Sequence, residues 1–99
     1  MYAEYQNMPK KNNTIRRGGW AVYMLACRDG SLYTGITNNL SRRLAAHKKG
    51  RGSKFVRSRL PFKVVRVERA SSKGAALRRE AEIKRMSRNG KVALVKGKL

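Results

Sequence analysis

Acidic residues are scarce in this chain of 99 residues, which has five Asp and Glu against 25 Lys and Arg and a formal net charge of +20. Positive charge at this density repels itself in the folded state, and a polyanionic partner explains it best. Nucleic acid is the leading candidate for that partner. A membrane surface is disfavoured, because no segment combines a basic face with a large, continuous apolar face.

Long hydrophobic runs are also lacking. No stretch approaches the roughly 20 apolar residues of a membrane span, and the N-terminus lacks the apolar centre of a signal peptide. The one cysteine, Cys27, cannot form an internal disulfide, and its apolar neighbours favour a small buried hydrophobe over a nucleophile. We therefore expect a soluble, cytoplasmic protein, and association with the nucleoid stays open.

The chain is long enough for one small domain, and its hydrophobic content of 40% is sufficient for a folded core. Residues 1–19 are polar and basic without a sustained period, which is typical of a flexible basic arm. The domain is expected to cover residues 20–96. Hydrophobic periodicity and turn residues predict strands at 20–27, 32–37 and 62–68, and helices at 40–48, 72–86 and 88–95. Strands interleaved with helices predict an α+β fold, in which helices flank a three-stranded antiparallel sheet.

Glu80 interrupts the apolar side of the long predicted helix, since Ala76 and Ile83 are its neighbours at helical spacing. A buried carboxylate is costly unless it is paired or binds a metal. Glu80 is therefore either a metal ligand or the partner of Lys84 one turn later, in an ion pair without further role. Both interpretations stay open at the level of the sequence.

The first predicted helix carries two further exceptions. Arg43 and His47 fall on the same face as Leu40 and Leu44, where the period predicts core residues. The simple interpretation is that the arginine snorkels past the leucines and that the histidine is structural. The alternative is that both groups serve a site.

The predicted hairpin contains two tyrosines whose faces depend on the turn. A three-residue loop at 28–30 places Tyr23 opposite Gly35 and brings Tyr23 and Tyr33 to one face, whereas a two-residue turn at 29–30 separates them. We expect the three-residue loop. Gly35 within a strand often marks a close approach by a ligand or another backbone.

These exceptions add up to one carboxylate, one arginine, one histidine and two phenols. A carboxylate can hold a divalent cation, the cation and an arginine can neutralise charge that develops on a phosphate, and a phenol can orient or deprotonate water. The sequence has no Ser-His-Asp set, no glycine-rich phosphate loop and no Cys/His zinc spacing. The set is that of a phosphodiester-cleaving site, which we expect on one solvent-accessible concave surface formed by Tyr23, Tyr33, Arg43, His47 and Glu80.

The same residues resemble a known family. Val22-Tyr23-Met24, then Tyr33-Thr34-Gly35 ten residues on, followed by Arg43, His47 and the helical Glu80, are similar to the motifs of GIY-YIG nucleases, in particular the small stand-alone bacterial domains. The resemblance implies a three-stranded antiparallel sheet and cleavage of nucleic acid with one divalent cation, Mg²⁺ or Mn²⁺. It also implies roles: Glu80 matches the metal ligand, Arg43 the catalytic arginine, Tyr33 and Tyr23 the two motif tyrosines, His47 an active-site histidine and Gly35 the second-motif glycine. Ala21, Met24 and Thr34 depart from the motifs without removing a reactive group.

The leading hypothesis is therefore a metal-dependent endonuclease that hydrolyses DNA with little sequence specificity, with structure selectivity left open. Either tyrosine could activate water, and Tyr33 is preferred. The expected partner is DNA, with RNA as an open alternative, no membrane, and a monomeric protein. A non-catalytic nucleic-acid-binding module and a ribosome-associated RNA binder are the alternatives. Backbone contacts, which weaken steeply with salt, are expected from the arm and from Gly35, Lys48, Lys49, Arg51, Lys54, Arg57, Arg59 and Lys84.

Overall fold

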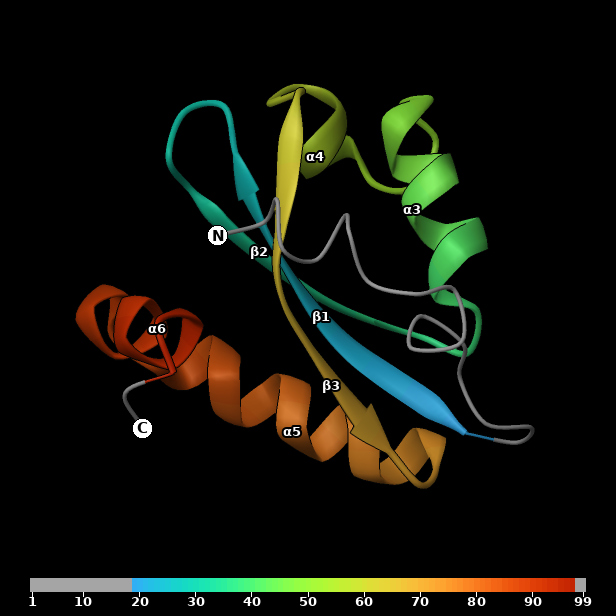
Figure 1. Ribbon diagram of the computed structural model, residues 1–99, viewed down its shortest axis with the longest axis vertical. Coiled ribbons are helices and arrows are strands. Elements are labelled where there is room, and N and C mark those ends of the chain that lie inside the picture. The colour runs from blue at the N-terminus through green and yellow to red at the C-terminus, as the bar shows by residue number, and fades with distance from the viewer. Residues whose placement is uncertain (1–18, 98–99) are drawn as a thin grey trace.

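Residues 19–97 of the chain are described by a computed structural model (Figure 1). One antiparallel sheet has the strand order β2-β1-β3. The elements follow one another as β1 (Trp20–Cys27), β2 (Leu32–Thr37), α3 (Leu40–Lys48), α4 (Lys54–Arg57), β3 (Phe62–Ala70), α5 (Lys73–Arg85) and α6 (Arg88–Val95). The predicted α+β fold with a three-stranded antiparallel sheet is confirmed. The expected arm lies outside the described residues except for Gly19, and within residues 19–97 no helix is long and apolar enough to cross a membrane.

The helices begin where side chains satisfy free backbone N–H groups. Asn39, Ser53, Ser72 and Ser87 each accept a hydrogen bond from the backbone N–H three residues further on. Such caps favour helix initiation because the first N–H groups of a helix have no partner within it. Local sequence therefore explains the starts of all four helices in the described part of the chain.

The sheet separates two hydrophobic clusters. Val22 and Met24 of β1 pack on α5 and α6, whereas Tyr23 and Leu25 face α3 and α4. This alternation follows from the period of two in a strand. Figure 1 shows the two helical layers on opposite sides of the sheet.

The hairpin between β1 and β2 uses the expected three-residue loop. Gly30 has a φ of +86°, a conformation that favours glycine, and its N–H donates to the carbonyl of Cys27. Tyr23 therefore lies opposite Gly35 and Leu25 opposite Tyr33, which brings both tyrosines to one face of the sheet. Cys27 is buried, as expected, and burial raises the pKa of its thiol.

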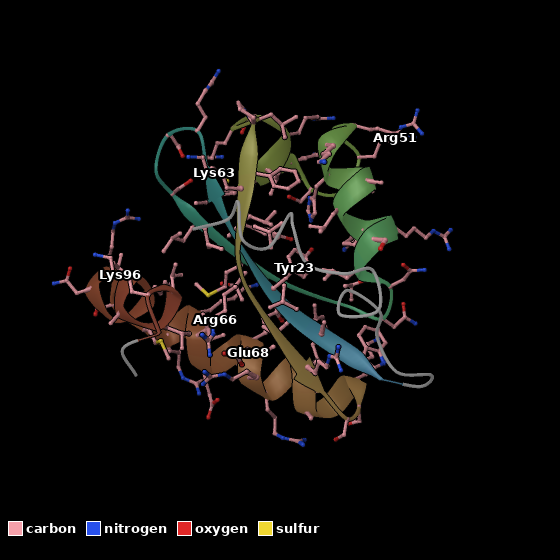
Figure 2. The ribbon with its side chains drawn as sticks, in the orientation of Figure 1. Tyr23, Arg51, Lys63, Arg66, Glu68 and Lys96 are labelled. Atoms are coloured by element: carbon pink, nitrogen blue, oxygen red, sulfur yellow. The ribbon has the colours of Figure 1, made fainter. Side chains whose placement is uncertain are left out.

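An ionic network holds β3 against the C-terminal helices. The register between β1 and β3 shifts at Val65, so that Arg66 and Glu68 face α5 (Figure 2). The Glu68 carboxylate accepts from Arg66 Nε at 2.6 Å and from Arg79 Nε at 2.8 Å. Arg66 also donates to the carbonyl of Leu94 near the end of α6. The network thus links the strand to α5 and to α6.

Candidate functional site

A buried hydrogen bond between Tyr23 and His47 forms the centre of the candidate site. Tyr23 Oη lies 2.8 Å from His47 Nε2, and neither residue has exposed surface. The strand register directs Tyr23 toward α3, and His47 comes from the last turn of that helix. Burial raises the pKa of Tyr23 to about 12. Burial also lowers the pKa of His47, and the charge of Arg43 lowers it further, so the bond joins a neutral phenol to a neutral imidazole at pH 7.

Complete burial of Tyr23 and His47 corrects one expectation. We predicted that five side chains would share one solvent-accessible surface, and this is wrong for these two. Glu80, on α5, belongs to the helical layer on the other side of the sheet. The helix face that carries His47 closes directly on the sheet face that carries Tyr23, which excludes water from the contact. Tyr23, with its raised pKa, is poorly suited to accept a proton at neutral pH. This favours Tyr33 as the group that faces the solvent side of the site.

Two glycines make room for this pair. A Cβ on Gly35 would lie 2.7 Å from Tyr23 Oη and 3.1 Å from Tyr33 Cε2. A Cβ on Gly52 would collide with His47 Nδ1, which has no hydrogen-bond partner among the described residues. The close approach expected at Gly35 is thus real, but it is an approach of tyrosine side chains. Gly35 is buried, so its predicted contact with nucleic acid is replaced by a packing role.

Tyr33 extends the aromatic cluster toward the surface. Its half-buried ring lies 6.2 Å from the ring of Tyr23, 5.4 Å from that of His47 and 6.0 Å from that of Phe55, measured between centroids. Tyr33 is therefore held by aromatic neighbours while part of its side chain stays accessible. This is the arrangement that a tyrosine acting on a bound phosphodiester would need.

Arg43 lies beside an open pocket at the start of α3. The pocket is lined by Thr37, Asn38, Asn39, Arg42, Arg43 and Ala46. Arg43 is half-buried, and its buried Nε has no hydrogen-bond partner within residues 19–97. A buried, unsatisfied charged donor is costly. A phosphate oxygen is the kind of acceptor that would complete it.

Glu80 lies in the other helical layer, on α5. Its side chain is 19% exposed and its Oε2 lies 3.3 Å from Nζ of Lys84. This is the contact that the ion-pair interpretation predicts. Lys84 is 56% exposed, however, and an exposed pair at this helical spacing contributes only about 0.3–0.5 kcal/mol. The pair is therefore too weak to prevent a divalent cation from binding the carboxylate.

The residues present fit a metal that is shared with substrate. In the described part of the chain, no three His, Cys, Asp or Glu side chains come close enough to form a resident metal site. Mg²⁺ keeps several waters and commonly binds through one or two carboxylates together with substrate phosphates. Glu80, with one carboxylate, matches that mode.

Exposed cations gather at the end of α3 and on α4, and others lie along α5 and at the two ends of α6. The side chains of Lys48, Lys49, Arg51, Lys54 and Arg57 are exposed, and Figure 2 shows Arg51 extending away from the fold. Each of the four carboxylates in residues 19–97 forms an ion pair with a lysine or an arginine. They belong to Asp29, Glu68, Glu80 and Glu82. Most of the positive charge is therefore not neutralised within the domain.

Comparison with known proteins identifies the fold family. Residues 19–93 match the GIY-YIG catalytic domain. The chain belongs to the GIY-YIG domain family. A UPF0213 protein of Natronomonas pharaonis is 51% identical over 74 residues, which cover 75% of this chain and 87% of that protein. A UPF0213 protein of Oceanobacillus iheyensis is 47% identical, with coverage of 75% and 86%.

A solved structure agrees with this assignment. The solution NMR structure of the UPF0213 protein BH0048 from Bacillus halodurans has a TM-score of 0.55 and 44% sequence identity, and the match covers 81% of this chain and 85% of that one. The GIY-YIG domain is a nuclease domain, which implies a nucleic-acid substrate. The names of the UPF0213 relatives state no activity.

The sequence did not predict the contacts that two residues of this region make. Nothing in the sequence marks Gly52 as important except that it is the second glycine of a basic loop. Its role, to leave room for the ring of His47, is visible only in the structure. Arg59 was expected at the nucleic-acid backbone, but its guanidinium binds Asp29, the Phe55 carbonyl and Ser58 within the protein. These partners engage Nε and one terminal nitrogen, and contact of Arg59 with nucleic acid stays a prediction.

Proposed function

We propose that this GIY-YIG protein is a divalent-metal-dependent endonuclease that hydrolyses phosphodiester bonds of DNA with little sequence specificity. The observation that carries the proposal is the position of Arg43, a half-buried cation that lines an open pocket next to the cluster of Tyr23, Tyr33 and His47. A phosphate that enters the pocket would give this guanidinium an anionic partner.

The residues divide into groups that touch the substrate and groups that position them. Arg43 binds the scissile phosphate and neutralises the charge that develops on it. Tyr33 orients the attacking water, and its oxygen accepts the proton of that water as the phenol's own proton passes to the solvent that reaches the half-buried side chain. Tyr23 and His47 are positioning residues, because their mutual hydrogen bond fixes α3, and with it Arg43, against the sheet.

Glu80 would hold Mg²⁺ or Mn²⁺ together with a phosphate of the substrate. The bound ion supplies Lewis-acid stabilisation of the phosphate and of the leaving oxygen. Lys84 is exposed, so its ammonium could give up the carboxylate to such an ion.

The exposed cations of α3 and α4 give the affinity for the backbone. Contacts from Lys48, Lys49, Arg51, Lys54 and Arg57 carry no base information, so the proposal includes weak sequence preference. RNA offers the same phosphates and is a second possible substrate. We propose that the protein acts as a monomer in the cytoplasm, where its polyanionic partner is available.

A cleavage assay with matched variants tests the proposal. Purified protein is incubated with linear and branched DNA, with Mg²⁺ or Mn²⁺ and with chelator. Glu80→Gln should bind DNA like wild type but lose cleavage. The control is Glu82→Gln, which changes another α5 carboxylate and should cut normally. Arg43→Lys should cut poorly, because lysine lacks the planar fork that grips a phosphate.

The outcomes separate the two classes of function. Cleavage by wild type that is lost in Glu80→Gln supports the endonuclease. Unchanged cleavage in that variant shows that the assignment of the metal ligand is wrong. Wild-type binding without cleavage under every metal condition supports the alternative, a non-catalytic binding module, which the Glu80–Lys84 ion pair favours.

A further inference from the structure

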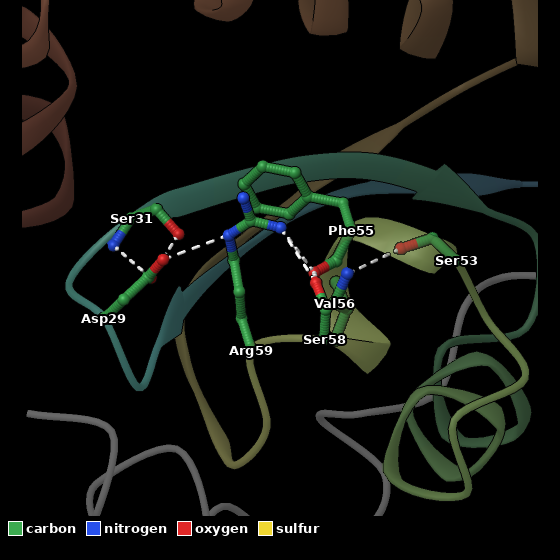
Figure 3. Close-up of polar contacts among 7 residues, drawn as sticks. All are labelled: Asp29, Ser31, Ser53, Phe55, Val56, Ser58 and Arg59. Atoms are coloured by element: carbon green, nitrogen blue, oxygen red, sulfur yellow. Dashed lines mark hydrogen bonds and ion pairs between the residues drawn. The ribbon is translucent and has the colours of Figure 1, made fainter.

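Arg59 and Phe55 form a stacked pair on the basic face of the domain. The Arg59 Cζ lies 3.8 Å from the centroid of the Phe55 ring (Figure 3). Phe55 is 38% exposed and is one of two large hydrophobic side chains that residues 19–97 leave exposed. Exposure of an aromatic ring is unfavourable in itself, so its place among cations calls for a reason.

Hydrogen bonds fix the plane of the guanidinium. Arg59 Nε donates to Asp29 Oδ2 at 3.0 Å, and one terminal nitrogen donates to the Phe55 carbonyl at 3.1 Å and to Ser58 Oγ at 3.0 Å (Figure 3). Donors of a guanidinium lie in its plane, so these bonds orient the group without occupying its faces. One face rests on the Phe55 ring, and the side chain is still 34% exposed.

The partner residues are themselves held in place. Asp29 accepts from the backbone N–H and from the hydroxyl of Ser31. Ser53 caps the short helix that carries Phe55 by accepting from Val56 N–H. The result is a flat, pre-ordered surface that joins the hairpin loop to α4.

We propose that Arg59 and Phe55 form a stacking platform for an unpaired nucleobase. Bases that are not paired stack on aromatic rings and on arginine planes, and such stacking tolerates any base. Base pairs inside a duplex do not offer their faces. The charge of Asp29 is neutralised by Arg59, so it does not oppose the phosphates of the strand.

The platform adjoins the candidate site. The Phe55 ring is stacked on that of Tyr33 at an interplanar angle of 29°, and Lys54 and Arg57 on the same helix are exposed. A strand whose base stacks on the platform therefore has its neighbouring phosphates beside these cations and beside Tyr33. This inference deepens the proposed function, on which it rests for the nature of the ligand. It predicts a preference for DNA with an unpaired base.

Binding is measured by fluorescence anisotropy in chelator, so that no cleavage occurs. The three probes are single-stranded oligothymidylate, a duplex with one bulged base, and the matched perfect duplex. Phe55→Leu should weaken binding of the probes with an unpaired base by about fivefold or more, with the perfect duplex unchanged. Phe55→Trp should bind like wild type. If Phe55→Leu weakens binding of the single strand alone, the platform takes bases of single-stranded DNA. If it weakens binding of the bulged duplex as well, the platform also takes an unpaired base within a duplex.

Charge is separated from stacking by two further variants. Arg59→Lys keeps the charge, so it should weaken single-strand binding while the slope of affinity against salt stays the same. Lys54→Ala, the control, should weaken all three probes alike and reduce that slope by about one. Thermal unfolding of each variant checks the fold, and Arg59→Lys decides the question if Phe55→Leu does not fold.

Equal losses on all three probes, or no loss in either platform variant, would overturn the inference. The result is independent of catalysis. A protein that cuts DNA but shows no effect of Phe55→Leu lacks the platform and keeps the proposed function. A protein that loses single-strand binding in Phe55→Leu but never cuts keeps the platform and lacks the proposed activity.

Discussion

A methyl group added at Gly52 should displace the imidazole of His47. The Cβ of Gly52→Ala would collide with Nδ1 and would lie 2.7 Å from both Cε1 and Cγ of the ring. The ring cannot move away easily, because it is fully buried, bonded to Tyr23 and bordered by the Tyr33 and Phe62 rings. The φ angle of Gly52 is not positive, so alanine adds no backbone strain. The expected effect is therefore purely steric.

The size of this effect follows from the cost of overpacking a core. Inserting one extra methyl group into a packed core destabilises by about 1–3 kcal/mol. For a domain of 60–100 residues, 1 kcal/mol lowers the melting temperature by about 4–8 °C. Gly52→Ala should thus melt at least about 4 °C below wild type. The matched control is Gly74→Ala on α5, where the nearest atom to the new Cβ lies 3.4 Å away and the melting temperature should not fall.

The chain has a single histidine, so NMR of the imidazole reports on this contact without assignment. Burial holds the pKa of His47 below its ordinary value, and displacement toward solvent in Gly52→Ala should raise that pKa. In a double-mutant cycle, Gly52→Ala should cost nothing further once His47 is replaced by alanine. An unchanged melting temperature together with an unchanged imidazole pKa would refute the reasoning.

Three other predictions concern stability and affinity. Because the pKa of His47 is lower in the folded state than in the unfolded one, the free energy of unfolding should fall as the pH decreases below about 6.5, and His47→Gln should flatten this dependence in denaturant titrations. Glu68→Gln should lower the free energy of unfolding by about 1–2 kcal/mol, since it weakens the bonds from Arg79 and Arg66; Glu82→Gln, at the exposed end of the same network, should change it by less than about 0.5 kcal/mol. A chain that begins at Gly19 should bind DNA more weakly, with a shallower salt dependence in anisotropy titrations, because the cations of the preceding segment are lost. An unaltered slope in that chain would contradict a role of the segment in binding.

Local signals in the sequence were enough to predict all the elements except α4, and much of the hairpin. Helix starts can be located in the sequence because a capping side chain, such as that of Asn39 or Ser72, needs only the next turn of backbone. Gly30 announces the three-residue loop because its positive φ is a property of one residue. That loop sets the register, and the register alone brings Tyr23 and Tyr33 to one face. The family motifs are likewise short segments in a fixed order along the chain, so the sequence is enough to recognise them.

Contacts between elements decided the rest. Helical periodicity placed His47 and Arg43 on an inward face, but only the packing of α3 on the sheet determines that His47 is sealed against Tyr23 while Arg43 borders an open pocket. Glu80 illustrates the same limit, since its spacing allows the ion pair with Lys84, but only the packing of α5 on the sheet puts it in the helical layer opposite α3. Gly52 and Arg59 acquire their roles from residues 5 and 30 positions away, respectively. Spacing along one helix or strand thus determined which residues point inward, and the meeting of α3, α4 and the hairpin determined what each of them touches.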